Sequence, residues 1–341
     1  MTMDLPDKDA LGRYLENHIQ EFESLVDVEK FSNGQSNPTY LLNAESGQYV
    51  LRRQPLGELL KSAHAVDREY RVIKALKGTE VPVARAYHLC EDRDVIGSMF
   101  YVMSYQKGRI FWDPSLPELN NNQRAGIYDE MNRMLAALHD VEVDAVGLGD
   151  FGRAGNYFER QVSRWSKQYK ASETTRIDAM DTLMQWLPAN MPVDDGMVSL
   201  IHGDYRLDNI IFHADECKAV ALLDWELSTL GHPYADLAYQ CMQLRVDRDD
   251  AIAGLGDADR SALGIPSEDE YVTQYCQRRG IAEIPHWNFY LAFSFFRLAA
   301  ILQGVLKRAI DGNASSEKAF VYGKFAPKLA NMAIELIEEA A

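Results

Sequence analysis

The stretch His202–Asn209 reads HGDYRLDN, and fifteen residues after Asn209 the chain reads DWE at Asp224–Glu226. The first stretch has the form H-x-D-x4-N. An apolar run, Val220–Leu223, leads directly into Asp224 and favours a strand that ends at this carboxylate. Either half alone is a weak signal, because a polar turn with an incidental acid is common. The two halves together, with room for a short hairpin between them, favour a functional site.

Oxygen-bearing side chains in this order suit phosphoryl transfer. That reaction needs one carboxylate beside the accepting hydroxyl and oxygen ligands for Mg²⁺ near the phosphates. We predict that Asp204 is the catalytic base that orients the hydroxyl. We predict that Asn209 and Asp224 bind the metal, since Mg²⁺ prefers hard oxygen ligands.

These motifs resemble the catalytic loop and metal-binding segment of the protein-kinase-like fold. They are most similar to the aminoglycoside phosphotransferase and choline kinase branch, in which His-Gly-Asp replaces His-Arg-Asp. The resemblance extends over nearly the whole chain, and one subgroup is especially similar: the N-terminal kinase-like domains of acyl-CoA dehydrogenase family members ten and eleven. The segments that carry this similarity are residues 49–55, 64–70, 103–105 with 108–109, and 156–161. No dehydrogenase part accompanies them, so we expect a stand-alone version.

The resemblance implies an α+β fold of two lobes, a small antiparallel-sheet lobe and a larger, mainly helical lobe. It also implies ATP and Mg²⁺ as cofactors and an alcohol group as phosphoryl acceptor. The pattern of apolar residues along the chain supports two lobes, because short strand patterns prevail up to residue 106 and long helical patterns follow. We therefore predict a nucleotide-binding lobe at 1–106 and a catalytic and substrate lobe at 107–341.

The nucleotide site is expected in the first lobe. A turn-rich loop at 32–37 lies in a predicted hairpin, where backbone N–H groups can cradle phosphates, although Gly34 is its only glycine. Ser36 and Asn37 are candidate side-chain donors in the same loop. Taken alone, an ordinary hairpin turn is the commoner interpretation of such a loop, and its position one strand before Arg52 strengthens the functional one.

Arg52 stands where the family resemblance leads one to expect Lys, so this chain departs from the pattern there. A guanidinium keeps the charge and can hold a phosphate oxygen and a carboxylate, in a different geometry. Its expected partner is Glu69 on the following helix, seventeen residues later. The neighbouring Arg53 is the alternative, but strand alternation places it on the other face.

Three further expectations follow from the resemblance. The backbone of Ser104, Tyr105 and Gln106 is expected to bind the adenine base, with Met103 packing nearby. His202 and Asp236 are expected to support the catalytic loop. The role of Glu226 stays open: it is either a partner of the metal ligands or a simple surface acid.

The acceptor is expected to be a small hydroxylated molecule, because only eight residues separate Asp224 from Pro233 and no Ala-Pro-Glu follows. Its class stays open. The acidic chain suits a cationic acceptor, such as an aminoglycoside or an amino alcohol. Arg160 and Arg164 belong to a basic stripe in 157–170 that suits an anionic acceptor, such as a hydroxyacyl-CoA or a hydroxy acid. A solvated helix face is the commoner interpretation of such a stripe.

A function of another class also stays open. Arg52 in place of Lys and the one-glycine loop are compatible with a weakly catalytic nucleotide-binding module that acts through a partner protein. Asp204, Asn209 and Asp224, all present and in order, favour catalysis instead.

The composition excludes other classes of protein. With 35 Lys plus Arg against 51 Asp plus Glu, the 341-residue chain has a formal net charge of −16. This charge argues against nucleic acid or an anionic membrane as the main partner. The four cysteines form no CxxC pair, and no uninterrupted apolar run reaches the roughly 18 residues that a membrane span needs. The N-terminus lacks the features of a signal peptide. We therefore expect a cytoplasmic protein with reduced thiols.

Overall fold

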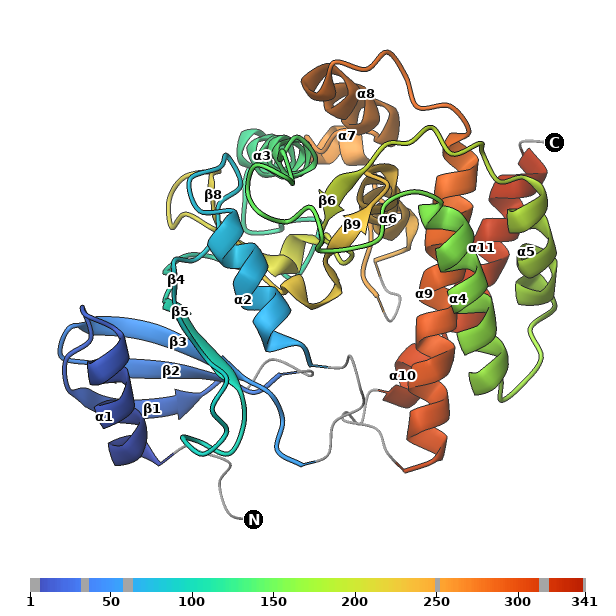
Figure 1. Cartoon of the computed structure of the whole chain (residues 1–341). Coiled ribbons are helices and arrows are strands. Elements are labelled where there is room, and N and C mark those ends of the chain that lie inside the picture. Colours follow the sequence, from blue (N-terminus) through green and yellow to red (C-terminus); the bar gives the residue numbers. More distant parts are fainter. Residues whose placement is uncertain (1–6, 32–36, 58–63, 249–251, 313–318, 340–341) are drawn as a thin grey trace. The chain divides into compact units, whose positions relative to one another are not determined.

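The computed structural model describes residues 7–31, 37–57, 64–248, 252–312 and 319–339 (Figure 1). Its internal contacts divide the chain into two compact units. The first comprises Met1–Arg109 and Asn209–Ser228, and the second comprises Ile110–Asp208 and Thr229–Ala341. The sheet lies in the first unit and most helices lie in the second, so the predicted α+β, kinase-like arrangement is confirmed.

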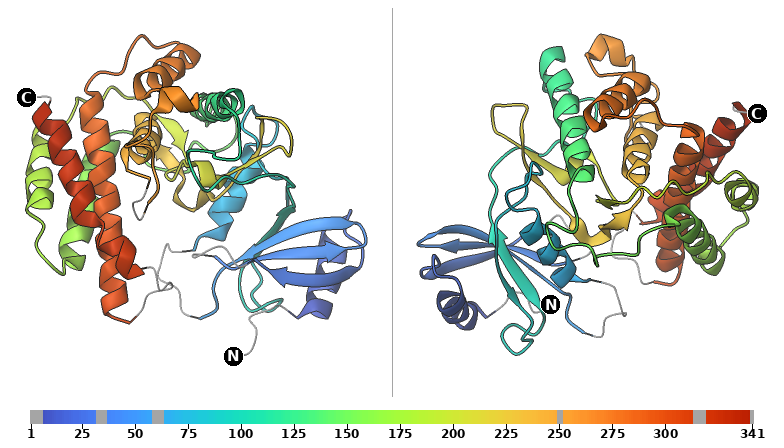
Figure 2. Two further views of the ribbon diagram at one scale, coloured as in Figure 1. Left: turned by 180° about the vertical axis from the view of Figure 1, so that it is seen from behind. Right: turned by 45° about the horizontal axis from the view of Figure 1, so that its top comes forward.

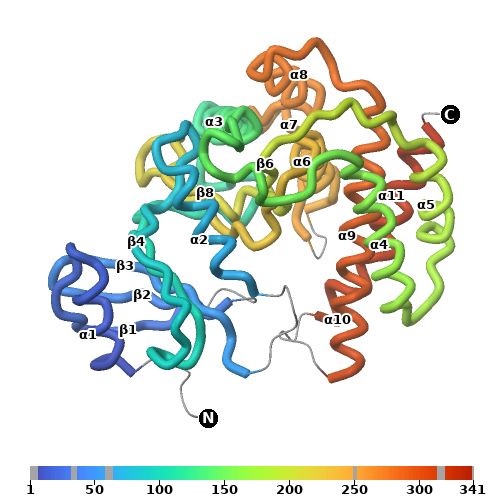
Figure 3. Tube along the Cα trace, in the orientation of Figure 1, coloured from blue at the N-terminus to red at the C-terminus, as the bar shows by residue number. Residues whose placement is uncertain are grey.

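The first unit is built on a five-stranded antiparallel sheet in the order β1-β2-β3-β5-β4. One face of the sheet and the apolar side of α1 bury a common core that includes Leu15, Leu42 and Phe100. The tube in Figure 3 follows the N-terminal part of this unit from dark blue to teal. Its elements are α1 (Lys8–His18), β1 (Leu25–Lys30), β2 (Thr39–Ala44), β3 (Gly47–Arg53), α2 (Val66–Ala75), β4 (Ala86–Cys90) and β5 (Phe100–Ser104).

A hairpin from much later in the chain also belongs to the first unit. It consists of β7 (Ile210–Phe212) and β8 (Ala219–Leu222), preceded by the 3-10 turn η1 (Leu207–Asn209) and followed by η2 (Trp225–Leu227). The Leu222 N–H donates to the Pro82 carbonyl at 2.8 Å, and Arg109 and Phe212 exchange two backbone hydrogen bonds of 2.8 Å. The predicted division at residue 106 assigns this hairpin to the second lobe. In the structure the hairpin packs within the first unit.

The second unit is a helical assembly around the long helix α9 (Trp287–Ile310), which contacts α4, α5, α6, α10 and α11. In both views of Figure 2, α11 (red) runs beside α9 (orange). A two-stranded sheet of β6 (Ser199–Ile201) and β9 (Thr229–Gly231) completes the unit. The other helices are α3 (Asn121–His139), α4 (Tyr157–Ser172), α5 (Asp178–Ala189), α6 (Tyr234–Arg245), α7 (Arg260–Leu263), α8 (Glu268–Arg279), α10 (Ala319–Gly323) and α11 (Ala326–Glu339).

Helix α9 is apolar on nearly all sides, which is typical of a helix at the centre of a helical core. Within the described residues it is the one helix whose length and composition would allow it to cross a membrane. In the structure 83% of its apolar 18-residue window is buried, because the surrounding helices cover it.

Candidate active site

An ion-pair cluster in the first unit centres on Arg52. Its Nε lies 2.7 Å from Glu69 Oε2, and its Nη2 lies 3.1 Å from Asp224 Oδ1. Glu226 is more distant, with 3.9 Å between its Oε2 and Arg52 Nη2. The structure therefore brings the predicted Arg52–Glu69 pair together and joins it to the predicted metal ligand Asp224. One guanidinium holds two carboxylates, which the fork geometry of Arg allows and the point charge of Lys does not.

Strand pairing explains why Arg52 points toward Glu69. Arg52 of β3 lies opposite Tyr101 of β5, so both side chains leave the same face of the sheet. Tyr101 donates its hydroxyl to Glu69 Oε2 at 3.1 Å, and Glu69 projects from α2, which contacts β4 and β5. Arg53 points to the other face, where it is buried over the Tyr40 ring.

The cluster is buried, and burial sets its electrostatics. Burial opposes the charge on Arg52, but Glu69 and Asp224 outweigh it and raise the pKa of the guanidinium above its usual value. Burial also raises the pKa of the Glu69 carboxyl, while Arg52 opposes that rise. The Arg52 charge is therefore permanent at any physiological pH.

Asn37 was predicted to donate a hydrogen bond to phosphate, but in the structure its side chain is bonded within the protein. It is 1% exposed, and its Nδ2 donates to Glu69 Oε1 at 2.8 Å. Its Oδ1 is hydrogen-bonded to His64 Nδ1 at 2.9 Å. Its amide thus holds Glu69 in position rather than standing free as a donor for phosphate. Gly34 and Ser36, the other candidates in the loop, lie outside the described residues.

The segment predicted to bind adenine lies at the end of β5, where its pairing with β3 stops. Met103 lies opposite Val50 of β3, and the Ser104 N–H donates to the Arg85 carbonyl at 2.9 Å. The Tyr105 N–H donates to the Gln48 carbonyl at 3.4 Å. Of the three amides in 104–106, only that of Gln106 has no partner among the described residues, which leaves it available to a ligand.

Asn209 and Asp224 lie at the same end of the hairpin. The Leu223 N–H donates to the Asn209 carbonyl at 2.8 Å, next to the Ile210–Leu222 pair. Asp224 has a left-handed backbone with φ 61°, a conformation that Asp and Asn tolerate better than most residues. It directly follows the strand and its side chain is 37% exposed.

The donor set at this hairpin end fits Mg²⁺. Within the described part of the chain, no group of three or more His, Cys, Asp or Glu side chains is placed to hold a metal. The hairpin instead offers a carboxylate and an amide oxygen, both hard ligands. Mg²⁺ usually takes one or two protein ligands and fills its other positions with water and substrate phosphates, so two protein ligands suffice.

Asp204 lies in the second unit, in a loop held through its backbone. The loop follows β6, and the buried Asp236 carboxylate of α6 accepts the His202 N–H at 2.6 Å and the Gly203 N–H at 2.8 Å. Burial opposes ionisation of Asp236, but its hydrogen bonds to His139 and to the loop backbone keep its pKa below the usual value. Gly203 has φ +84°, a conformation that requires glycine. The Asp204 N–H donates to His202 Nδ1 at 3.3 Å.

Charged and phenolic groups surround the Asp204 carboxylate. Arg206 carries an Nε that donates to Asp208 Oδ1 at 2.9 Å. Burial opposes the charge on Arg206, but Asp204 and Asp208 raise its pKa above the usual value. Burial also raises the pKa of the Tyr239 phenol, and its hydrogen bond to Asp204 adds to the rise. Asp204 therefore faces a permanent cation and a neutral phenol.

Three residues of the site were not predicted from the sequence. Tyr101 and His64 hold the Glu69 cluster, and Tyr239 contacts Asp204. Strand alternation alone places Tyr101 on a face, but only the register shows that Arg52 is opposite. Tyr239 lies three residues after Asp236 on α6, and this spacing puts both side chains on one face of the helix. That spacing is the sequence feature from which a place for Tyr239 near the catalytic loop could have been predicted.

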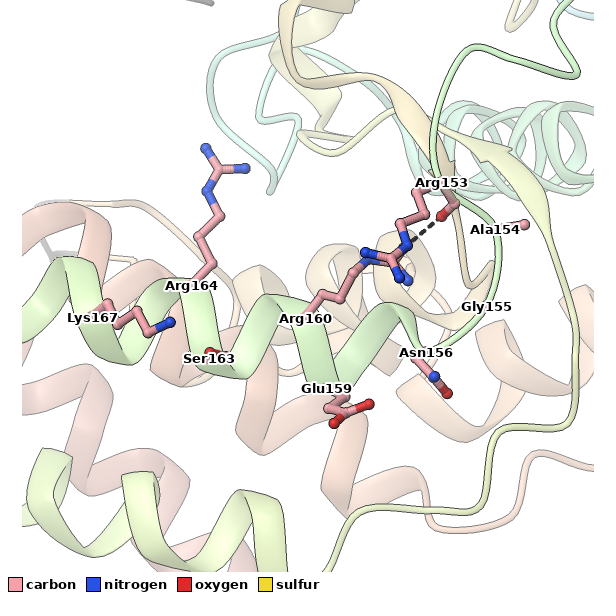
Figure 4. Close-up of a pocket in the computed structure, with 9 residues that line it drawn as sticks. All are labelled: Arg153, Ala154, Gly155, Asn156, Glu159, Arg160, Ser163, Arg164 and Lys167. Carbon is pink, nitrogen blue, oxygen red and sulfur yellow. Dashed lines mark hydrogen bonds between the residues drawn. The ribbon is translucent and has the colours of Figure 1, made fainter.

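Arg160 and Arg164 line one pocket at the start of α4, with a volume of about 690 Å³ (Figure 4). Arg160 Nη2 donates to the Arg153 carbonyl at 2.5 Å, and the Arg164 guanidinium lies 5.2 Å from the Trp165 ring centre. The lining contains four cationic side chains and a single carboxylate. It consists of Arg153, Ala154, Gly155, Asn156, Glu159, Arg160, Ser163, Arg164 and Lys167.

The sheet unit, the helical unit and the carboxylates they carry define a protein of the kinase-like class. The phosphotransferase enzyme family (APH) matches residues 27–271, and the chain belongs to this family.

Known proteins agree with this assignment. Acyl-CoA dehydrogenase family member 10 of Mus musculus is 47% identical over 334 residues, which cover 97% of this chain and 31% of that protein. The chain thus spans about a third of that relative, and the predicted resemblance is confirmed. A solved chain from Ralstonia eutropha, provisionally described as an aminoglycoside phosphotransferase, is 49% identical with a TM-score of 0.91, covering 98% of this chain and 99% of that one.

A more distant structure shares the fold alone. Aminoglycoside phosphotransferase APH(4)-Ia, solved in a ternary complex with AMP-PNP and hygromycin B, has 13% identity and a TM-score of 0.62. The match covers 96% of this chain and 98% of that chain.

Proposed function

We propose that this protein is an ATP- and Mg²⁺-dependent kinase that phosphorylates a hydroxyl group of a small molecule. The observation that carries the proposal is the Arg52–Glu69–Asp224 cluster, in which a predicted phosphate-binding cation and a predicted metal ligand meet. Membership of the phosphotransferase family supports the reaction class. The complex of APH(4)-Ia with AMP-PNP supports the choice of an adenine nucleotide.

Each residue has a defined role in this proposal. Arg52, oriented by Glu69, binds phosphate oxygens of ATP, and the Gln106 amide is the free backbone donor for the base. Asn209 and Asp224 would hold Mg²⁺, which when bound neutralises charge on the phosphates. Asp204 accepts a hydrogen bond from the acceptor hydroxyl and aims it at the phosphoryl group, taking its proton as transfer proceeds.

We further propose that the acceptor is anionic, such as a hydroxyacyl-CoA or a hydroxy acid. In a chain with net charge −16, the pocket at the start of α4 has four cations against one carboxylate. Its volume of about 690 Å³ falls in the usual range for ligand pockets, roughly 300–1,000 Å³. A relative that is named as a member of the acyl-CoA dehydrogenase family supports an acyl-CoA-linked acceptor.

An assay of ADP release with Mg-ATP tests the proposed reaction. The acceptor panel sets hydroxyacyl-CoAs and free hydroxy acids against aminoglycosides and amino alcohols. We expect release with the anionic acceptors. Release with the cationic acceptors alone would keep the kinase and contradict the proposed acceptor class. No release with any acceptor, together with ATP binding, would favour the nucleotide-binding module.

Reversing charge in the pocket should weaken binding of an anionic acceptor. Each charge-assisted hydrogen bond contributes about 1.5–3 kcal/mol, so Arg160→Glu with Arg164→Glu should raise the KM for the acceptor by at least about 10- to 100-fold. The KM for Mg-ATP should stay unchanged. The matched control is Arg308→Glu, an exposed Arg of α9 outside this pocket. Equal effects of the pocket variant and the control on the acceptor KM would contradict the assignment.

A further inference from the structure

The peptide bond that joins Gly203 to Asp204 is held at both of its polar atoms. Its carbonyl oxygen accepts a hydrogen bond from Nη2 of Arg297, on α9, at 2.6 Å. Its N–H donates to His202 Nδ1 at 3.3 Å. Arg297 is separated from Gly203 by 94 residues and is 6% exposed. The orientation of this peptide plane sets the direction in which the Asp204 side chain leaves the backbone.

Arg297 also reaches Asp204 through a second residue. Its guanidinium carbon lies 5.1 Å from the Tyr239 ring centre and 5.8 Å from the Trp165 ring centre. Tyr239 in turn hydrogen-bonds to Asp204, which is one cause of its raised pKa. One side chain therefore supports both the backbone before Asp204 and the phenol that contacts its carboxylate.

The charge of Arg297 is not balanced by an ion pair. Among the described residues no carboxylate lies within 4.0 Å of its guanidinium, which contacts the Gly203 carbonyl and the rings of Trp165 and Tyr239. A buried charge without an ion pair is costly, and a well-packed apolar residue of similar size often serves stability as well or better. Stability alone therefore gives a poor account of an arginine at this position.

We propose that Arg297 is a positioning residue for Asp204. Its role is to fix the Gly203–Asp204 peptide and Tyr239 so that the carboxylate has one orientation toward the acceptor hydroxyl. This inference rests on the proposed function of Asp204 as the base, and it adds a residue that the kinase motifs do not contain.

Kinetics of Arg297→Met test the proposal. A displacement of about 1 Å in a reacting group can cost on the order of 100-fold in rate, so kcat should fall by about that factor. The KM values for Mg-ATP and for the acceptor should stay within about twofold, because Arg297 is only 6% exposed and its guanidinium is engaged by the Gly203 carbonyl. Arg297→Lys keeps a donor for the Gly203 carbonyl and should recover part of kcat. Arg308→Met, an exposed substitution on the same helix, should behave like the wild type.

Amide hydrogen exchange provides a readout that needs no turnover. In Arg297→Met the amides of 202–205 should exchange faster than in the wild type, while the amides of the first unit should not change. If the wild type turns over no acceptor, the kinase proposal fails. Faster exchange in Arg297→Met would still support the conclusion that Arg297 fixes the Gly203–Asp204 peptide. If Arg297→Met does not fold, the same two measurements on Arg297→Lys decide, with intermediate values expected.

Two results would overturn the proposal. One is wild-type kcat with unchanged exchange in Arg297→Met, which would mean that the loop keeps its geometry without the guanidinium. The other is an acceptor KM that rises while kcat is preserved. That pattern would make Arg297 a binding residue for the acceptor rather than a positioning residue for Asp204.

Discussion

Asp204→Ala is expected to lower kcat by roughly 10²- to 10⁴-fold, the range that a positioned general base contributes. Affinity for Mg-ATP should change little, because Asp204 is not among the predicted nucleotide and metal ligands. Folding should tolerate the change, since Arg206 keeps its bonds to Asp208 when Asp204 is removed. Turnover by ADP release and nucleotide affinity by calorimetry, on the same preparation, separate the two effects.

Two further variants sharpen the Asp204 experiment. Asp204→Asn keeps the shape and removes the basic oxygen, so it should be nearly as inactive as alanine. Asp269→Ala removes an exposed carboxylate of α8 in the same unit and should retain full activity. Retention of more than about a tenth of wild-type kcat in Asp204→Asn would contradict the assignment of Asp204 as base.

Asp224→Asn is expected to raise the Kd of Mg-ATP by roughly 10- to 100-fold, because a carboxylate contact to a cation contributes about 1.5–3 kcal/mol. Asparagine is chosen because it tolerates the left-handed backbone at this position. Binding of ATP in the presence of EDTA should not weaken, since no metal then bridges the carboxylate to the phosphates. The loss of one negative charge beside Arg52 should, if anything, favour free ATP.

The comparison with and without metal distinguishes metal binding from general damage. Titration calorimetry with ATP in Mg²⁺ and in EDTA gives the two affinities directly. Asp215→Asn, an exposed carboxylate of the same hairpin, is the matched control and should leave both unchanged. An equal loss of affinity in Mg²⁺ and in EDTA would show that Asp224 supports the fold of the hairpin rather than the metal.

Local sequence predicted the main chemistry, and the family resemblance that its motifs carry implied the fold class. The order of Asp204, Asn209 and Asp224 and the strand before Asp224 lie within 21 consecutive residues, so short-range patterns carry that information. The Arg52–Glu69 pair could also be predicted, because a strand and the next helix place both residues by their periodicity. In these cases the information lies in residue type and spacing, interpreted through the family resemblance.

Other features depend on contacts between residues far apart in the chain. Asn37 is a plausible phosphate donor by its loop, yet it is buried against Glu69 because α2 packs there. The hairpin at 209–228 joins the first unit through Pro82 and Arg109, which no pattern within the hairpin indicates. Arg297 is one cation among several along its helix in the sequence, and only packing brings it to the Gly203 carbonyl. Residue type and spacing thus specify which groups can do the chemistry, whereas long-range packing decides which neighbours orient them, because a hydrogen bond across 94 residues leaves no periodic trace in the sequence.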